Sequence, residues 1–243
     1  RQMCIRDRLR HEEFTKNRKL QDLLIERGIK IYIAQNAEEW KKNQDPQGKV
    51  GLREVKIEDL LPREEIQVVM DSVGALLRGK RVLITGAAGS IGSEIMRQVA
   101  SFNPYKLILV DQAESPLYDV QLELSDHWKN LEVRVLVADV ANRTRMEAIF
   151  EETRPQLVFH SAAYKHVQLM DDFVSEAIQT NISGTVNIAD LAVKYRVSRM
   201  VMISAANARH PENAMEYSKR VAEIYVQSSD CRLKRDKGET DMF

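Results

Sequence analysis

Three glycines at intervals of three follow a short apolar run near the middle of the chain, within Arg81-Val-Leu-Ile-Thr-Gly-Ala-Ala-Gly-Ser-Ile-Gly-Ser-Glu-Ile95. The apolar run is typical of a buried strand, and the glycines predict a tight turn. Beyond the turn the apolar spacing becomes helical. A glycine-rich motif is informative in this strand–turn–helix context and weak outside it. We therefore expect the chain to fold around this unit.

Each glycine has a separate expected task. Gly86 permits the turn, Gly89 lets backbone N–H groups approach a pyrophosphate, and Gly92 lets the helix pack closely on its strand. The helix start at Ser90 and Ile91 then supplies unpaired N–H donors and the positive end of the helix dipole. The spacing is one residue longer in the first gap than in the commonest dinucleotide fingerprint.

A second apolar run, Lys106-Leu-Ile-Leu-Val110, ends in an acid, Asp111. An acid about 20 residues beyond the glycine turn is expected to bind the ribose hydroxyls of a dinucleotide. A carboxylate there disfavours a 2′-phosphate, so NAD is the expected cofactor and NADP the alternative. A Rossmann-like domain that binds no dinucleotide is the competing interpretation.

The overall composition excludes several classes of protein. Among 243 residues, 36 basic side chains balance 36 acidic ones, which argues against a nucleic-acid partner. The two cysteines, Cys4 and Cys231, form no metal-binding or disulfide pattern, so we expect no metal and a cytoplasmic setting. No apolar run reaches the roughly 18 residues of a membrane span, and no signal peptide is visible.

The sequence predicts three parts. Residues 1–50 read as a fragment of an upstream α/β domain, with residues 1–8 foreign to the rest of the chain, as a sequencing or cloning remnant would be. Residues 51–78 read as a connector that ends in a helix around Glu64–Leu77. Residues 79–243 read as an NAD(P)-binding domain truncated at its carboxyl end, so the whole chain is expected to be an internal fragment.

From residue 79 onward strands and helices are expected to alternate. The predicted strands are Val82–Ile84, Leu107–Val110, Val133–Ala138, Leu157–Phe159 and Met200–Ile203. Helical patterns occupy residues 91–101, 114–127, 143–153, 173–196 and 215–229. This alternation predicts an α/β fold, a Rossmann-like doubly wound parallel sheet with right-handed crossovers.

Ligands of open parallel sheets bind at the carboxyl ends of the strands. Asp139 and Val140 follow the third strand and are expected to meet an adenine ring, with helix capping as the alternative. The fourth strand ends at His160, expected to be structural or at the substrate edge rather than a metal ligand. Beyond it, the small Ala162 and Ala163 are expected to allow close approach of a cofactor. Two lysines, Lys165 and Lys219, are cofactor contacts or solvated surface residues, and the spacing of Lys219 behind a strand-end serine suits a contact with the nicotinamide ribose.

Together these motifs resemble the polysaccharide-biosynthesis nucleotide-sugar 4,6-dehydratases, which are extended short-chain dehydrogenases/reductases. The resemblance rests on Gly86-Ala-Ala-Gly-Ser-Ile-Gly-Ser-Glu94, Asp111-Gln-Ala-Glu-Ser115, Ala162-Ala-Tyr-Lys-His-Val167 with Leu169-Met170, and Asn181 with Gly184. It runs almost continuously over residues 50–229. The segment Ala163-Tyr-Lys-His-Val167 is far more specific than the glycine turn.

The resemblance implies a redox-neutral reaction on a UDP-N-acetyl-hexosamine. Bound NAD(P)+ takes a hydride from sugar C4, water leaves across C5 and C6, and the hydride returns to C6. The product is a 4-keto-6-deoxy sugar for surface glycans. The resemblance also implies a UDP-sugar partner, a homo-oligomer, and a full-length protein anchored at the cytoplasmic face of the inner membrane. The segment that holds the UDP-sugar would lie beyond this chain.

One loop departs from the family. The family reads Ser-Thr-Asp-Lys-Ala-Val-Asn-Pro where this chain reads Ser204-Ala-Ala-Asn-Ala-Arg-His-Pro211. Ala206 and Asn207 therefore occupy the acid and base positions, and neither side chain suits proton transfer. Met215 stands four residues before Lys219, where ordinary short-chain dehydrogenases have tyrosine. Loss of such groups typically costs about 10²–10⁴ in rate each, so weak or absent dehydratase activity is expected.

The expected catalytic positions are thus Ser204, Met215 and Lys219. The expected cofactor-binding residues are Gly86, Gly89, Ser90, Ile91, Gly92, Asp111, Asp139, Val140, Ala162, Ala163, Lys165, Asn181 and Lys219. A nucleotide-sugar dehydratase is the first hypothesis. An epimerase or reductase on the same scaffold, and a non-catalytic NAD-binding module, are the alternatives.

Overall fold

The computed structural model describes residues 32–34, 52–54, 70–204 and 210–237. The chain divides into two units, residues 1–68 and 69–243. In the first, β1 (Tyr32–Ala34) pairs antiparallel with β2 (Leu52–Glu54). The sequence pattern Ile29-Lys-Ile-Tyr-Ile-Ala34 is typical of a strand, and its described part is β1. Leu52–Glu54, expected in a connector, is also a strand. The helical pattern over residues 9–28 lies outside the described residues.

The second unit contains five parallel strands in the order β5-β4-β3-β6-β7. Their bounds are β3 Arg81–Thr85, β4 Lys106–Asp111, β5 Val133–Val137, β6 Leu157–His160 and β7 Arg199–Met202. Neighbouring strands are in regular register, with Val82 opposite both Leu107 and Leu157. The order reverses at β3, so the loops after β3 and β6 diverge there, as at the ligand sites of doubly wound sheets. The predicted fold class is confirmed.

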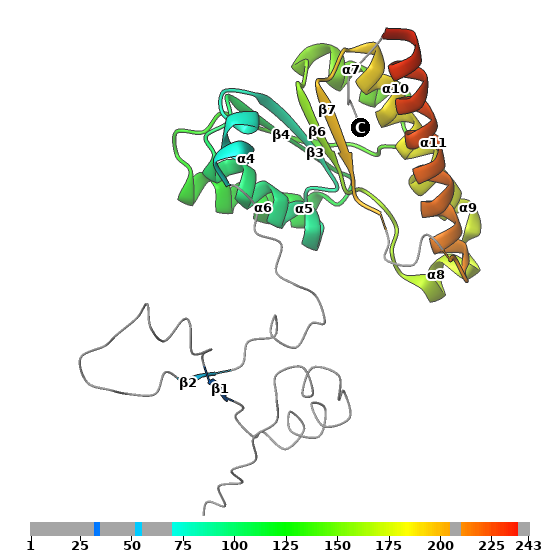
Figure 1. The fold of residues 1–243 in the computed structure, drawn as a ribbon, viewed down its shortest axis with the longest axis horizontal. Helices are drawn as coiled ribbons and strands as arrows, with labels where there is room; N and C mark the ends of the chain where they lie inside the picture. The colour runs from blue at the N-terminus through cyan, green and yellow to red at the C-terminus, as the bar shows by residue number, and fades with distance from the viewer. Residues whose placement is uncertain (1–31, 35–51, 55–69, 205–209, 238–243) are drawn as a thin grey trace, which may run out of the picture. The chain divides into compact units, whose positions relative to one another are not determined.

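Helices cover both faces of this sheet (Figure 1). Alternate strand residues point to opposite faces, so Val82 and Ile84 join one core and Leu83 joins the other. The first core lies under α4 (Met70–Leu77), α5 (Ser90–Ser101) and α6 (Glu114–His127). The second lies under α7 (Arg143–Thr153), α10 (Thr185–Lys194) and α11 (Ala214–Lys237). Burial on both faces explains why the strands are continuous apolar runs.

One predicted helix differs from the structure. The pattern over residues 173–196 indicated a single helix, but the structure has α9 (Val174–Ala177), a π-helical stretch η2 (Ile178–Gly184) and then α10. A π-helical stretch keeps the chain helical with i→i+5 hydrogen bonds, and such stretches are frequent at functional sites. The short helix α8 (Val167–Asp172) was not expected at all.

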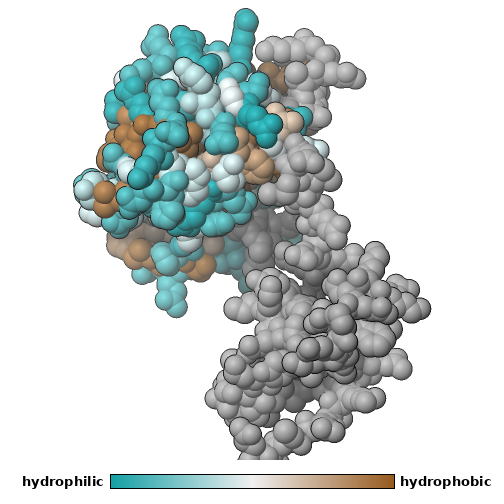
Figure 2. All heavy atoms as spheres, turned by 90° about the vertical axis from the view of Figure 1, so that its left-hand side faces the viewer, coloured by the Kyte–Doolittle hydropathy of each residue, from teal (hydrophilic) through white to brown (hydrophobic). Residues whose placement is uncertain are grey.

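The face shown in Figure 2 is mostly hydrophilic, with smaller apolar patches between. This distribution fits amphipathic helices that bury one side against a sheet and expose the other. Within the described ranges, no helix combines the length and the apolar character that crossing a bilayer requires.

Candidate functional site

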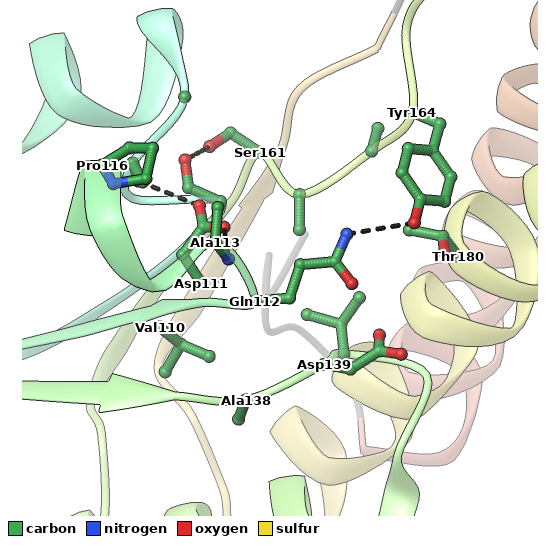
Figure 3. A pocket seen from close by; sticks show the side chains of 16 residues that line it. Val110, Asp111, Gln112, Ala113, Pro116, Ala138, Asp139, Ser161, Tyr164 and Thr180 are labelled. Atoms are coloured by element: carbon green, nitrogen blue, oxygen red, sulfur yellow. Dashed lines mark hydrogen bonds between the residues drawn. The ribbon is translucent and has the colours of Figure 1, made fainter. Parts of the chain in front are cut away.

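A cavity of about 240 Å³ opens at the carboxyl ends of the strands (Figure 3). Residues that follow four different strands line it, because parallel strands all end at this edge of the sheet. Gly86 and Gly89 come from the turn after β3, Asp111 from β4, Asp139 from β5, and Ala162 from the loop after β6. The sequence placed candidate residues at each of these strand ends.

The glycine turn is tightly packed at two of its three glycines. Gly86 has φ +69°, and a Cβ on it would lie 2.5 Å from the backbone nitrogen of Ala162. A Cβ on Gly92 would lie 2.0 Å from the carbonyl oxygen of Gly86, so only glycine lets α5 sit against the turn. Gly89 is different, since a Cβ there would meet only the Gly86 oxygen, at 3.3 Å. Packing within the protein therefore requires glycine at 86 and 92. At 89 a Cβ would need only a small adjustment.

Gly89 is also the N-cap of α5 and, as a glycine, has no side chain to cap this helix start. An uncapped helix N-terminus presents backbone N–H donors and a partial positive charge to an anion. Ser90 and Ile91 begin the helix, and both are exposed. The ammonium of Lys165, from the loop after β6, lies 3.3 Å from the Ser90 hydroxyl. The helix start thus offers an anion backbone donors next to Gly89, which lines the pocket, together with the nearby ammonium of Lys165.

The two acids of the pocket are already bonded to the backbone. Asp111 accepts the N–H of Ala88 at 2.9 Å through one carboxylate oxygen and that of Ala113 at 3.0 Å through the other. Asp139 accepts the N–H of Ala141 at 2.8 Å. These bonds hold both carboxylates in place, and each oxygen keeps a further lone pair for a ligand donor. The helix cap that was the alternative for Asp139 is supplied by Asn142, which accepts the N–H of Arg145.

Asn181 lies behind the pocket wall and is not among the residues that line the cavity. Its side chain is fully buried; its oxygen accepts the N–H of Tyr164 at 2.8 Å and its nitrogen donates to the Tyr164 carbonyl at 3.1 Å. The same nitrogen donates to the hydroxyl of Ser218 on α11. The amide thus joins the loop after β6 to the helix that carries Lys219, which is a positioning contact rather than a pocket contact.

His160 ends β6 and is completely buried between two threonines. Nδ1 lies 2.7 Å from the Thr85 hydroxyl and Nε2 lies 2.9 Å from the Thr185 hydroxyl. Thr185 donates its own proton to the Asn181 carbonyl, so it accepts from Nε2–H, and Nδ1 accepts from Thr85. Burial, helped by the charge of Lys219, lowers the pKa of His160 to about 3. The ring is a neutral bridge between β3 and α10, in agreement with the structural interpretation.

Lys219 is buried on the first half of α11, with only 5% of its surface exposed. Burial lowers the pKa of its ammonium to about 8, although the nearby Glu223 acts in the opposite direction. The Ser204 hydroxyl, just beyond β7, is also buried, and no hydrogen bond satisfies it within the described residues. A desolvated amine and an unpaired hydroxyl are costly to bury, and perturbed groups of this kind cluster at functional sites.

Ala163 and Val140 line the pocket, and Met215 is partly buried at the start of α11. Ala206 and Asn207 lie outside the described residues. Gln112, Tyr164 and Thr180 also line the pocket. Gln112 and Tyr164 stand within the sequence motifs quoted above but had no expected task, and Thr180, which lies in η2, was not among the expected residues.

The parallel order, the glycine turn after the first strand of the sheet and the strand-end acid define a Rossmann-like fold of the short-chain dehydrogenase/reductase type. Residues 82–242 match the family described as polysaccharide biosynthesis protein, and the chain belongs to this family. The resemblance drawn from the motifs is confirmed.

Two relatives and one solved structure illustrate the match. The capsular polysaccharide biosynthesis protein CapD of Staphylococcus aureus is 43% identical over 190 residues, covering 78% of this chain and 31% of CapD. A UDP-N-acetylglucosamine 4,6-dehydratase (inverting) of Campylobacter jejuni is 29% identical over 139 residues, which are 57% of this chain and 40% of that enzyme. The structure of WbmG from Bordetella bronchiseptica with NAD and UDP aligns at a TM-score of 0.54 and 25% identity, over 62% of this chain and 50% of WbmG. The chain thus spans about a third of CapD.

Proposed function

We propose that this chain is the NAD-binding part of a nucleotide-sugar 4,6-dehydratase-type protein that acts on a UDP-N-acetyl-hexosamine in surface polysaccharide biosynthesis. The observation that carries the proposal is the pocket in which an uncapped helix start, a backbone-held Asp111 and the small Ala162 meet. An uncapped N-terminus suits a pyrophosphate, and an oriented carboxylate suits ribose hydroxyls. WbmG, whose structure contains NAD and UDP, supports the same assignment.

In this proposal each part of the site has one task. The α5 N-terminus and Lys165 bind the pyrophosphate, Asp111 accepts from the ribose, and Asp139 with Val140 borders the adenine. When bound, the nicotinamide supplies hydride transfer to and from the sugar. Lys219 donates to the nicotinamide ribose, and Ser204 offers the sugar its hydroxyl, which bonds to nothing within the described residues. A ligand donor or acceptor would relieve the cost of burying these two groups.

Proton transfer is the step of the proposed reaction for which this chain lacks the family's side chains. The family acid and base positions hold Ala206 and Asn207 in this sequence. Neither residue exchanges a proton near neutral pH, so we infer turnover far below that of a dehydratase with both groups. The same two residues favour a second candidate, a module that binds NAD without catalysis. The partly buried Met215 at the tyrosine position counts against an epimerase or reductase.

The proposal is tested in two stages. NADH fluorescence titration of the chain measures cofactor binding, and absence of binding would remove both candidates. A chain extended to a whole catalytic domain, with residues 79–243 unchanged, is then incubated with UDP-N-acetylglucosamine and NAD+, and mass spectrometry measures loss of one water. A parallel sample carries Ala206→Asp and Asn207→Lys. Product only in the parallel sample supports a dehydratase scaffold without its acid and base; equal product in both samples contradicts our interpretation of the loop.

A further inference from the structure

A hydrogen bond crosses the pocket between two residues to which neither the sequence nor the family resemblance assigned a role. The side-chain nitrogen of Gln112, just after β4, donates to the Tyr164 hydroxyl, in the loop after β6, at 3.2 Å. Figure 3 shows the Gln112 side chain reaching over to the tyrosine. Both residues line the cavity. The bond therefore joins two strand ends between which a ligand has to fit.

The burial of the surrounding residues shows on which side of the cavity this bond lies. Val110 and Val140, which also line the cavity, are buried, with 0% and 3% of their surfaces exposed. Gln112 is exposed and Tyr164 is half-buried. The apolar residues thus form the floor against the protein core, and the Gln112–Tyr164 bond lies on the solvent side.

The backbone segments that carry the two residues are held by other hydrogen bonds. Asn181 holds the backbone N–H and carbonyl of Tyr164 from behind. Gln112 follows Asp111, whose carboxylate is fixed by two backbone N–H groups. A hydrogen bond between two anchored segments loses little entropy on forming, so it can re-form after each opening.

We propose that Gln112 and Tyr164 form a strap that opens to admit the dinucleotide and closes over it, slowing its release. The ligand named here rests on the proposed function. In the redox-neutral reaction proposed above, the hydride taken from the sugar returns to the sugar within one turnover. The cofactor then has no need to leave between turnovers, and a strap that retains it is compatible with that cycle.

The test measures release of NADH from the 243-residue chain. The chain is loaded with NADH and mixed with excess NAD+, and loss of bound NADH fluorescence gives the dissociation rate. Tyr164→Phe keeps the ring but removes the bonded hydroxyl, and Gln112→Leu removes the donor at similar size. A net neutral hydrogen bond corresponds to about threefold to tenfold in rate, so each variant should release NADH faster by that factor. Tyr105→Phe is the matched control, since Tyr105 is 61% exposed and precedes β4, away from the strand ends that line the cavity.

The double variant separates a shared bond from two independent contacts. If the two side chains act through one bond, the double variant releases NADH no more than about twice as fast as either single variant. Release at the wild-type rate in both single variants, or multiplied effects in the double variant, would overturn the strap alone. Failure of the unaltered chain to bind NADH would instead overturn the proposed function, and the strap with it.

Discussion

The two sides of the carboxyl edge of the sheet differ in how their polar groups are satisfied. On the β3–β4–β5 side, Asp111 and Asp139 are held by backbone N–H groups. On the β6–β7 side, Lys219 is buried with a lowered pKa, and Ser204 buries a hydroxyl that no hydrogen bond satisfies within the described residues. On the first side the charged groups are hydrogen-bonded without a ligand. On the second side the free-energy cost of burying an amine and a hydroxyl is not offset.

We infer from this difference that the β3–β4–β5 side suits binding and that the β6–β7 side suits a reactive group. Groups that are already oriented lose little entropy on meeting a ligand, so they give affinity. Groups that stay desolvated and underpaired destabilise the fold, and such strain is retained where a reactive group has to be poised. His160 joins the two sides through buried hydrogen bonds, with Thr85 on β3 and with Thr185 on α10.

The largest expected effect concerns the packing that supports the binding side. Gly92→Ala would place a methyl group 2.0 Å from the Gly86 carbonyl oxygen, so it should destabilise the fold by about 3 kcal/mol or more. Urea unfolding measures the free energy. Gly89→Ala is the control, because its methyl meets only one atom, at 3.3 Å, and should cost far less. Equal losses in the two variants would contradict the packing account.

Lys219→Met sharpens the comparison on the reactive side. The folded-state pKa of Lys219, about 8, lies below its unfolded value of 10.5, so the unfolded chain binds more protons between these values. Stability of the unaltered chain should therefore rise from pH 8 to pH 10.5, by at most about 3 kcal/mol from this residue. The variant should lack that rise and be the more stable at pH 7. If the unfolding free energies of the two chains changed with pH in the same way, burial would not be lowering the pKa of Lys219.

Gly89→Asp tests the pocket face of the turn. A carboxylate there would fill the approach to the helix start and repel a diphosphate, so NADH affinity should fall about a hundredfold or more. Fluorescence titration measures it, and urea unfolding should show a much smaller change than for Gly92→Ala. Unchanged affinity would mean that the turn does not bind the cofactor.

Asp111→Ala gives the smallest effect of the four. Removing the ribose acceptor should weaken NAD binding about tenfold, because hydrogen bonds to a charged group are the stronger kind. The preference for NAD over NADP should narrow as well, since the carboxylate that repels a 2′-phosphate is gone. Asp111→Asn, which keeps one oxygen acceptor, should have an NAD affinity between those of the unaltered chain and Asp111→Ala. If the ratio of NAD affinity to NADP affinity equalled that of the unaltered chain, Asp111 would not be part of the cofactor site.

Much of the second unit was predictable because its signals are local. The predicted strands and most helices agree with the structure to within one or two residues at their starts. The exceptions were η2 and α8, where no periodicity marks a π-helical turn or a single short helix. Asn181 lies in η2. The sequence suggested that it contacts the cofactor, but in the structure its amide bonds to Tyr164 and Ser218.

The sequence by itself determined the succession of strands and helices along the chain, the glycine turn and the acid that ends β4. These features follow from apolar periodicity and glycine spacing, which are properties of neighbouring residues. Tertiary structure alone decided which face each strand residue buries, why Gly92 has no room for a side chain, and how His160 becomes a neutral bridge. It also decided that Gln112 meets Tyr164, which lies 52 positions further along the chain. Such contacts depend on which strands lie side by side, and that arrangement is settled by burying both faces of the sheet at once.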